Sequence, residues 1–141
     1  MNTQPIGAGR ATLFEVRTFR DSRGSLSVVE GEMDLPFVPR RLYYLHGSNA
    51  GQARANHAHR ADRQCMIAMA GRVEIEVDNG RERQTFVLDR PDQGLLLEPV
   101  VWCVVHMEDR ASVLAILAAN AFDSDDYIHD YDEFRALVGA P

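Results

Sequence analysis

The stretch 51-GQARANHAHRADRQCMIAMAG-71 decides the fold of this chain. Two histidines, His57 and His59, stand two residues apart, and a glycine stands six residues before the first of them. Residues two apart on a β-strand point to the same side. The segment therefore predicts a strand whose two histidines face one side of a sheet. Gly51 and Gly71 fit tight turns at the two ends of this strand pair, because glycine tolerates the backbone angles that such turns need.

The rest of the chain reads as many short strands. The clearest is a β-hairpin over 73-VEIEVDNGRERQTFVL-88, whose Asp-Asn-Gly is typical of a type I′ turn. The residues Asp21 to Gly24 (DSRG) signal another turn. A loop or edge is expected over 33-MDLPFVPR-40, because it carries two prolines. Further strands are expected in ATLFEVRTF (11–19), SLSVVE (25–30), RRLYYLHG (40–47), RQCMIAMAG (63–71), GLLLEPVVWCVVHM (94–107) and SVLAILAAN (112–120).

Only the tail, 124-SDDYIHDYDEFRALVG-139, is expected to be helical, with Ser124 as a candidate cap at the start of the helix. Many short strands with regularly spaced turn signals are typical of a sandwich or barrel. No linker or internal repeat is visible, and 141 residues suit one domain. The sequence thus predicts an all-β fold with a short C-terminal helix, as a single domain over residues 1–141.

The composition limits which classes of molecule this protein is expected to bind. The net charge of −6 and the lack of a basic stripe argue against binding to a nucleic-acid backbone. No apolar run approaches the length of a membrane span, and the first ten residues do not resemble a signal peptide, so a cytoplasmic protein is expected. All 15 basic residues other than histidine are arginines, which grip phosphates by paired hydrogen bonds. Cys65 and Cys103 lie in apolar runs and are expected to be buried thiols.

The spacing Gly–x5–His–x–His–x4–Gln–x6–Gly resembles the first motif of the cupin superfamily, small jelly-roll barrels. Metal-binding cupins carry glutamate at the position of Gln64. The second cupin motif resembles the Gly94 to Pro99 segment, but its histidine is missing here. A zinc or iron site commonly has three or four His, Glu, Asp or Cys ligands. The resemblance therefore implies a jelly roll without a metal, although Cys103 remains an alternative soft ligand.

Three interpretations of the histidine pair stay open at this point. Histidine titrates near neutral pH, so two histidines without a metal suit general acid–base catalysis. A second interpretation is a metal-dependent cupin enzyme. The third is a pair that is merely satisfied by hydrogen bonds in an inactive barrel.

Several segments together resemble the sugar-nucleotide 3,4-ketoisomerases, often called WxcM-like. These segments are DSRGSLSVVE, PFVPRRLYYL, RANHAHRADRQ, LLLEPVVW and DSDDYIHDYDEF. The resemblance extends over nearly the whole chain, from about Leu13 to Phe134. The family acts on dTDP-4-keto-6-deoxyglucose in deoxyamino-sugar biosynthesis. The resemblance implies a metal-free and cofactor-free isomerase that forms homodimers, often with exchanged N-terminal strands. It implies that His59 shuttles a proton between C3 and C4 with His57 as its partner, and that Tyr43 donates to a sugar oxygen.

The same resemblance implies the contacts to the nucleotide sugar. Arg54 and Arg23 are candidates to hold the diphosphate, and Arg41 is a weaker one. Gln64 would orient a histidine or contact the sugar. Trp102 would pack on sugar or base, or else lie in the core. The acidic residues Asp125, Asp126 and Asp132 are expected to be solvated or to cap a helix. Tyr44 is expected on the opposite face of its strand from Tyr43.

The chain also departs from the family pattern. Ala55 stands where members tend to have glycine, Arg60 where lysine is common, and Cys103 where many have histidine. The last change leaves open the stereochemistry at C4 and the exact hexose and nucleotide. A sugar-nucleotide-binding cupin that turns nothing over, or a metal-dependent cupin, is therefore the alternative to the enzyme.

Overall fold

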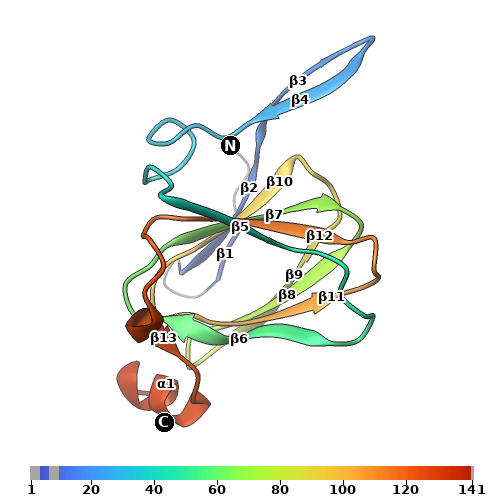
Figure 1. The fold of residues 1–141 in the computed structure, drawn as a ribbon. Helices are drawn as coiled ribbons and strands as arrows, with labels where there is room; N and C mark the ends of the chain where they lie inside the picture. The colour runs from blue at the N-terminus through green and yellow to red at the C-terminus, as the bar shows by residue number, and fades with distance from the viewer. Residues whose placement is uncertain (1–3, 7–9, 141) are drawn as a thin grey trace.

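Two antiparallel sheets pack face to face to form the body of the molecule (Figure 1). The structure is a computed structural model that describes residues 4–6 and 10–140. The first sheet has six strands, in the order β1 (Gln4–Ile6), β2 (Ala11–Glu15), β10 (Gln93–Leu97), β7 (Gln64–Ala70), β12 (Val113–Ala118) and β5 (Arg41–Leu45). The second has five, in the order β13 (Tyr127–Ile128), β6 (Ala53–His59), β11 (Trp102–Met107), β8 (Val73–Asp78) and β9 (Arg83–Leu88). This arrangement confirms the predicted all-β jelly roll.

Alternating apolar side chains of the two sheets fill the barrel. On β8, Val73, Ile75 and Val77 are fully buried, whereas the glutamates between them are only partly buried. Leu95 and Leu97 on β10 face them from the other sheet, within one core cluster. This period of two is what a strand with one face on a core requires. The two cysteines, Cys65 and Cys103, are free and buried, as predicted.

The hairpin of β8 and β9 forms as predicted, but its turn is not type I′. A type I′ turn needs positive φ at both central residues, but of residues 79–82, which connect Asp78 to Arg83, only Gly80 has a positive φ, of 94°. The Oδ1 of Asn79 accepts hydrogen bonds from the backbone N–H groups of Arg81 and Glu82, at 2.9 and 2.8 Å. These side-chain bonds stabilise a wider loop that competes with the tight turn.

The C-terminal tail covers the outer face of the five-stranded sheet (Figure 1). Its helix α1 (Tyr131–Leu137) is shorter than predicted and begins after Asp130, whose side chain caps it by accepting from Asp132 N and Glu133 N. Ser124 therefore does not cap this helix. Ser124 instead opens a single 3₁₀ turn (Ser124–Asp126), which is capped by the side chain of Asp123.

A two-stranded hairpin of β3 (Arg17–Asp21) and β4 (Gly24–Val28) projects from the body (Figure 1). The predicted Asp21 to Gly24 turn forms its tip. Phe19 pairs with Leu26 across the hairpin, and both side chains are 59% exposed. No helix in the described part of the chain is long and apolar enough to cross a membrane.

Candidate active site

A bulge in β6 sets the direction of the site residues. Cys103 of β11 pairs with His57, and the next residue, Val104, already pairs with Ala55, so Asn56 is an extra residue in β6. Ala55 and Asn56 have positive φ angles of 65° and 59°. Such a bulge bends the strand and shifts the alternation by one residue.

The shift brings Arg54 to the same side of the sheet as His57. Residues three apart on a regular strand face opposite sides. Here Arg54 lies opposite Val105, a residue of the barrel core, because directly paired residues share a face. Arg54 is exposed at this end of the strand, and its guanidinium reaches the hydroxyl of Ser48 at 3.5 Å.

The histidine pair points into the barrel, as predicted. Ala58 between the two histidines packs into the outer cluster under the tail, so its neighbours on the strand turn inward. The rings of His57 and His59 lie 4.9 Å apart between centroids, in an edge-to-face arrangement. Cys103 faces the same interior, because it is paired with His57 and belongs to the barrel core.

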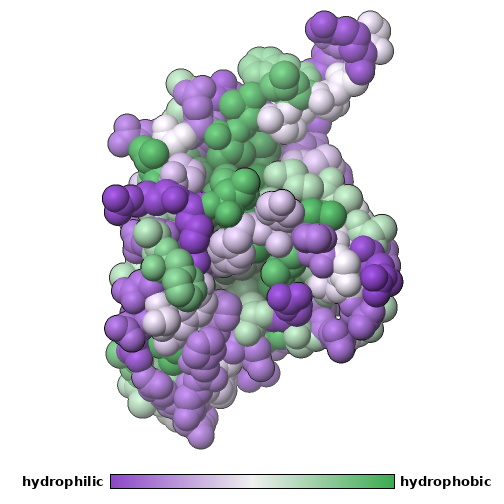
Figure 2. Space-filling model, in the orientation of Figure 1, coloured by the Kyte–Doolittle hydropathy of each residue, from purple (hydrophilic) through white to green (hydrophobic). Residues whose placement is uncertain are grey.

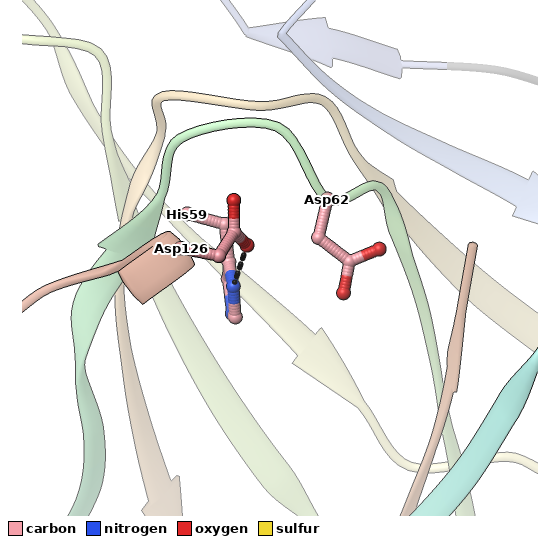
Figure 3. A group of neighbouring side chains, drawn as sticks. All are labelled: His59, Asp62 and Asp126. Carbon is pink, nitrogen blue, oxygen red and sulfur yellow. Dashed lines mark hydrogen bonds and ion pairs between the residues drawn. The ribbon is translucent and has the colours of Figure 1, made fainter. Parts of the chain in front are cut away.

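Asp126 holds His59 in one orientation. The Nδ1 of His59 lies 2.9 Å from the Oδ2 of Asp126 (Figure 3). The other oxygen of Asp126 accepts from the backbone N–H of Ala61 at 2.7 Å. A carboxylate can only accept hydrogen bonds, so Nδ1 carries the ring proton and donates a hydrogen bond to Asp126. The opposite ring nitrogen, Nε2, then carries a lone pair, as a general base requires.

This contact corrects the expectation that Asp126 is solvated or caps a helix. Its side chain is only 12% exposed, and it reaches His59 because β13 pairs with β6, with Tyr127 opposite His59. Asp125 is exposed and Asp132 is exposed in α1, which agrees with the expectation for these two residues.

Burial keeps both histidines neutral near pH 7. The pKa of His57 is lowered to about 4, mainly by desolvation and in smaller part by the nearby His59 and His129. Desolvation also lowers the pKa of His59, while the hydrogen bond and the charge of Asp126 oppose this shift. Because Asp126 raises its pKa, His59 is the member of the pair that accepts a proton more readily.

A tyrosine on β5 of the other sheet, Tyr43, packs against the barrel core. The Nε2 of Gln64 donates to the hydroxyl of Tyr43 at 2.9 Å, which leaves the hydroxyl hydrogen of Tyr43 free to donate elsewhere. Burial raises the pKa of Tyr43, so the phenol stays protonated. Tyr44, next to it, is 58% exposed on the opposite face, as predicted.

Two site residues were missed by the sequence reading. Tyr127 places its ring 5.0 Å from the ring of His57 and 4.5 Å from that of His59. Asp62 is 2% exposed and forms an ion pair with Arg41 at 3.1 Å. The tail segment that contains Tyr127 did contribute to the family resemblance, and this was the available signal. Asp62 likewise lies in the segment RANHAHRADRQ (54–64) that contributed to the resemblance.

The side chains near His59 are a poor set of metal ligands. His59, Asp62 and Asp126 each have a potential ligand atom within 4.8 Å of the others (Figure 3). Both oxygens of Asp126 already accept hydrogen bonds, as described above. The oxygens of Asp62 accept from Arg41 and from the backbone N–H of Asn120, and a guanidinium this close repels a cation. Burial raises the pKa of the Cys103 thiol to about 12, so it too is a weak ligand.

Two of the predicted binding residues are not brought to the histidine pair within this chain. Trp102 points outward, donates to Asn56 Oδ1 at 3.2 Å and packs against Phe134 and Tyr131 beneath the tail. This placement favours a role in the outer core over contact with a sugar. Arg23 lies at the tip of the projecting hairpin, where its side chain is 88% exposed and pairs with Asp21.

Comparisons with known proteins agree with this geometry. The family described as "FdtA: WxcM-like, C-terminal" matches residues 10–139. TDP-4-oxo-6-deoxy-alpha-D-glucose-3,4-oxoisomerase from Aneurinibacillus thermoaerophilus is 34% identical over 118 residues, which are 84% of this chain and 85% of that protein.

Solved structures show the same likeness. A 3,4-ketoisomerase from Helicobacter canadensis superposes with a TM-score of 0.88 at 31% identity, over 92% of this chain and 97% of that one. A histidine variant of the 3,4-ketoisomerase QdtA from Thermoanaerobacterium thermosaccharolyticum, in complex with TDP-4-keto-6-deoxyglucose, also has a TM-score of 0.88, at 29% identity over 92% and 94%.

The fold and the site define a cupin-type barrel built around a buried, carboxylate-held histidine. Within that class, the chain belongs to the WxcM-like, C-terminal (FdtA) family.

Proposed function

We propose that this protein is a single-domain, cytoplasmic, metal-independent isomerase that moves the keto group of dTDP-4-keto-6-deoxyglucose from C4 to C3. The observation that carries the proposal is the state of His59. Its ring is buried and neutral, Asp126 fixes the proton on Nδ1, and Nε2 has no hydrogen-bond partner among the described residues. A base in this state suits removal of a proton next to a carbonyl.

The reaction needs one carbon-bound proton to move. His59 removes the proton from C3 of the 4-keto sugar, and the electron pair of that C–H bond forms the double bond of an enediolate. The proton on the C3 hydroxyl passes to the oxygen on C4, and His59 returns a proton to C4. The product carries the carbonyl at C3 and the hydroxyl at C4, so no atom or electron is gained or lost.

The surrounding side chains have supporting roles. The free hydroxyl hydrogen of Tyr43 suits donation to a sugar oxygen, while Gln64 keeps that hydroxyl oriented. Arg54 suits the diphosphate, because it is exposed on the same side of β6 as His57. Two of the relatives support this choice of substrate: the Aneurinibacillus thermoaerophilus protein is named for a TDP-linked sugar, and the QdtA variant was solved with one.

Hydrogen exchange tests the activity directly. The protein, freed of metal by chelation, is incubated with dTDP-4-keto-6-deoxyglucose in D₂O and followed by NMR. We expect a new 3-keto sugar with deuterium at C4, and the same spectra give the configuration at C4. Tight dTDP binding without exchange would instead identify a binding module. Activity that returns only when zinc or iron is added back would identify a metal-dependent enzyme.

We also propose that the protein works as a homodimer. A two-stranded hairpin is marginal on its own, and β3 and β4 pair with neither large sheet. It exposes Phe19 and Leu26 on one face, and an apolar band continues below it on the body (Figure 2). A second copy of the chain would cover these side chains and receive Arg23 at the hairpin tip.

The dimer has its own test. Light scattering should give twice the mass of one chain for the wild type and the mass of one chain for a Phe19→Ser/Leu26→Ser variant. If Arg23 serves the site of the other subunit, an equal mixture of Arg23→Ala and His59→Asn chains should recover up to about a quarter of wild-type activity, because half of the dimers are mixed and each has one intact site. No recovery after verified exchange of subunits would place Arg23 outside the active site.

A further inference from the structure

Two buried polar atoms near the histidine pair lack partners. In the described part of the chain, three buried side-chain nitrogen or oxygen atoms have no hydrogen-bond partner, and two of these are His59 Nε2 and Arg41 Nε. Buried polar atoms are nearly always satisfied, because an unsatisfied one costs free energy. Two such atoms in one side-chain cluster indicate a place where a ligand supplies the partner.

The remaining nitrogens of Arg41 are held in place. NH2 donates to Asp62 Oδ2 at 3.1 Å, and NH1 donates to the hydroxyl of Tyr127 at 3.3 Å. The guanidinium carbon also lies 4.8 Å from the centre of the Tyr43 ring and 5.6 Å from that of Phe122. A guanidinium held by two partners and two rings has little freedom, so the direction of its Nε–H is set before a ligand arrives.

The same contacts tie Arg41 to the general base. Tyr127 bonds to Arg41 through its hydroxyl, and its ring lies 4.5 Å from that of His59. Asp62 bonds to Arg41 and has an oxygen within 4.8 Å of the ligand atoms of His59 and Asp126 (Figure 3). A cavity of about 420 Å³, lined by Arg41, Phe122 and Asp126 among others, opens beside this cluster.

We propose that Arg41 is a further catalytic residue, whose Nε–H holds the negatively charged oxygen of the enediolate formed when His59 removes the proton. This inference rests on the proposed function. When the C3–H bond breaks, the electron pair shifts into the C3–C4 double bond and the carbonyl oxygen on C4 takes the charge. Arginine does not give up its proton at neutral pH, so Arg41 stabilises this charge without protonating it.

The pairing with Asp62 argues against the alternative role of binding the diphosphate. Asp62 already balances the charge of Arg41, and its side chain is 2% exposed while that of Arg41 is 17% exposed. The exposed Arg54 has no carboxylate partner among the described residues and suits a diphosphate better. Arg41 instead suits a single charge that develops beside His59 during the reaction.

The experiment compares Arg41→Gln with Arg40→Gln, a matched control. Arg40 is the exposed neighbour that lines the same cavity, and its side chain forms no hydrogen bond or ion pair with the cluster among the described residues. For Arg41→Gln we expect kcat and C3 proton exchange in D₂O to fall about 10²- to 10³-fold, as for loss of one oxyanion donor, with the Kd for dTDP changed less than about threefold. Arg40→Gln should keep wild-type kcat.

A second variant guards against simple loss of the fold. If Asp62 without its partner prevents Arg41→Gln from folding, the Arg41→Gln/Asp62→Asn variant removes both charges and should show the same loss of kcat. In an Arg41→Ala variant, added guanidinium ion at non-denaturing concentration should restore part of kcat, whereas tetramethylammonium of equal charge should not.

The outcomes separate the two proposals. Equal kcat for wild type and folded Arg41→Gln overturns the role of Arg41 and leaves the proposed function in place. A loss that appears only as weaker dTDP binding also overturns it and assigns Arg41 to the diphosphate. A wild-type protein that catalyses no exchange overturns the proposed function itself, and the role of Arg41 with it.

Discussion

The Nδ1 of His59 lies 2.9 Å from Oδ2 of Asp126, a residue 67 positions later in the chain. The contact fixes the proton on one ring nitrogen and leaves the other as a base. In an Asp126→Asn variant, the amide can donate to Nδ1 and move the proton to Nε2. We therefore expect kcat to fall about 10²- to 10⁴-fold with little change in dTDP affinity. Asp125→Asn, an exposed neighbour, is the control, and unchanged kcat in Asp126→Asn would contradict the role.

The pH profile of kcat/KM should depend on the same contact between His59 and Asp126. Activity needs neutral His59, whose pKa is lowered from 6.5, so the acid limb of the wild-type profile should have its midpoint below pH 6.5. Asp126 raises this pKa through its hydrogen bond and its charge. The residual activity of Asp126→Asn should therefore have an acid limb at still lower pH. A midpoint above 6.5 in the wild type would argue against His59 as the base.

Protein stability should fall in acid because of His57. Its folded pKa of about 4 lies below the unfolded value of 6.5, so the unfolded chain binds more protons between these values. The proton uptake by His57 in the unfolded chain has no effect on stability above pH 6.5. It lowers the free energy of unfolding progressively as the pH falls from 6.5 towards 4. Replacement by Gln should reduce the loss of unfolding free energy between pH 7 and 4.5 by about 1–2 kcal/mol, measured by urea denaturation. An identical loss in both proteins would show that His57 is not the cause.

Tyr43 and Tyr44 form a natural pair of test positions. Tyr43→Phe removes the hydroxyl that Gln64 holds, so we expect kcat to fall about 10²-fold. It also leaves a buried amide of Gln64 without its partner, which should cost about 1–3 kcal/mol of stability. Tyr44→Phe lies on the exposed side of the same strand and should change neither property. Equal kcat in the two variants would remove Tyr43 from the mechanism.

The bulge in β6 predicts a stabilising substitution. Ala55 has φ of 65°, which costs an L-residue about 1–2 kcal/mol, whereas glycine adopts this angle freely. Ala55→Gly should therefore raise the free energy of unfolding by about 0.5–1 kcal/mol. Ala53→Gly, earlier in the same strand and without a positive φ, should lower it by a similar amount. Loss of stability in Ala55→Gly would show that this backbone angle is not strained.

The sequence by itself determined the β architecture, because its signals are local. The two-residue spacing of His57 and His59 and the period of two in β8 each depend on neighbours along one strand. The turn at Asp21 to Gly24 is local in the same sense. The prediction of a type I′ turn between β8 and β9 was wrong, because the side chain of Asn79 offers a competing set of hydrogen bonds.

The arrangement around the histidines was decided only by the tertiary structure. Asp126 and Tyr127 reach His59 because β13 pairs with β6, and Asp62 meets Arg41 across 21 residues. The bulge at Ala55 and Asn56 places Arg54 beside His57 against the ordinary alternation of a strand. Such contacts depend on strand pairing between distant segments and on one inserted residue. Neither the pairing of distant strands nor the inserted residue leaves a periodic pattern along the chain. The sequence pattern therefore revealed His59 as the base but not Asp126 and the other side chains that hold it.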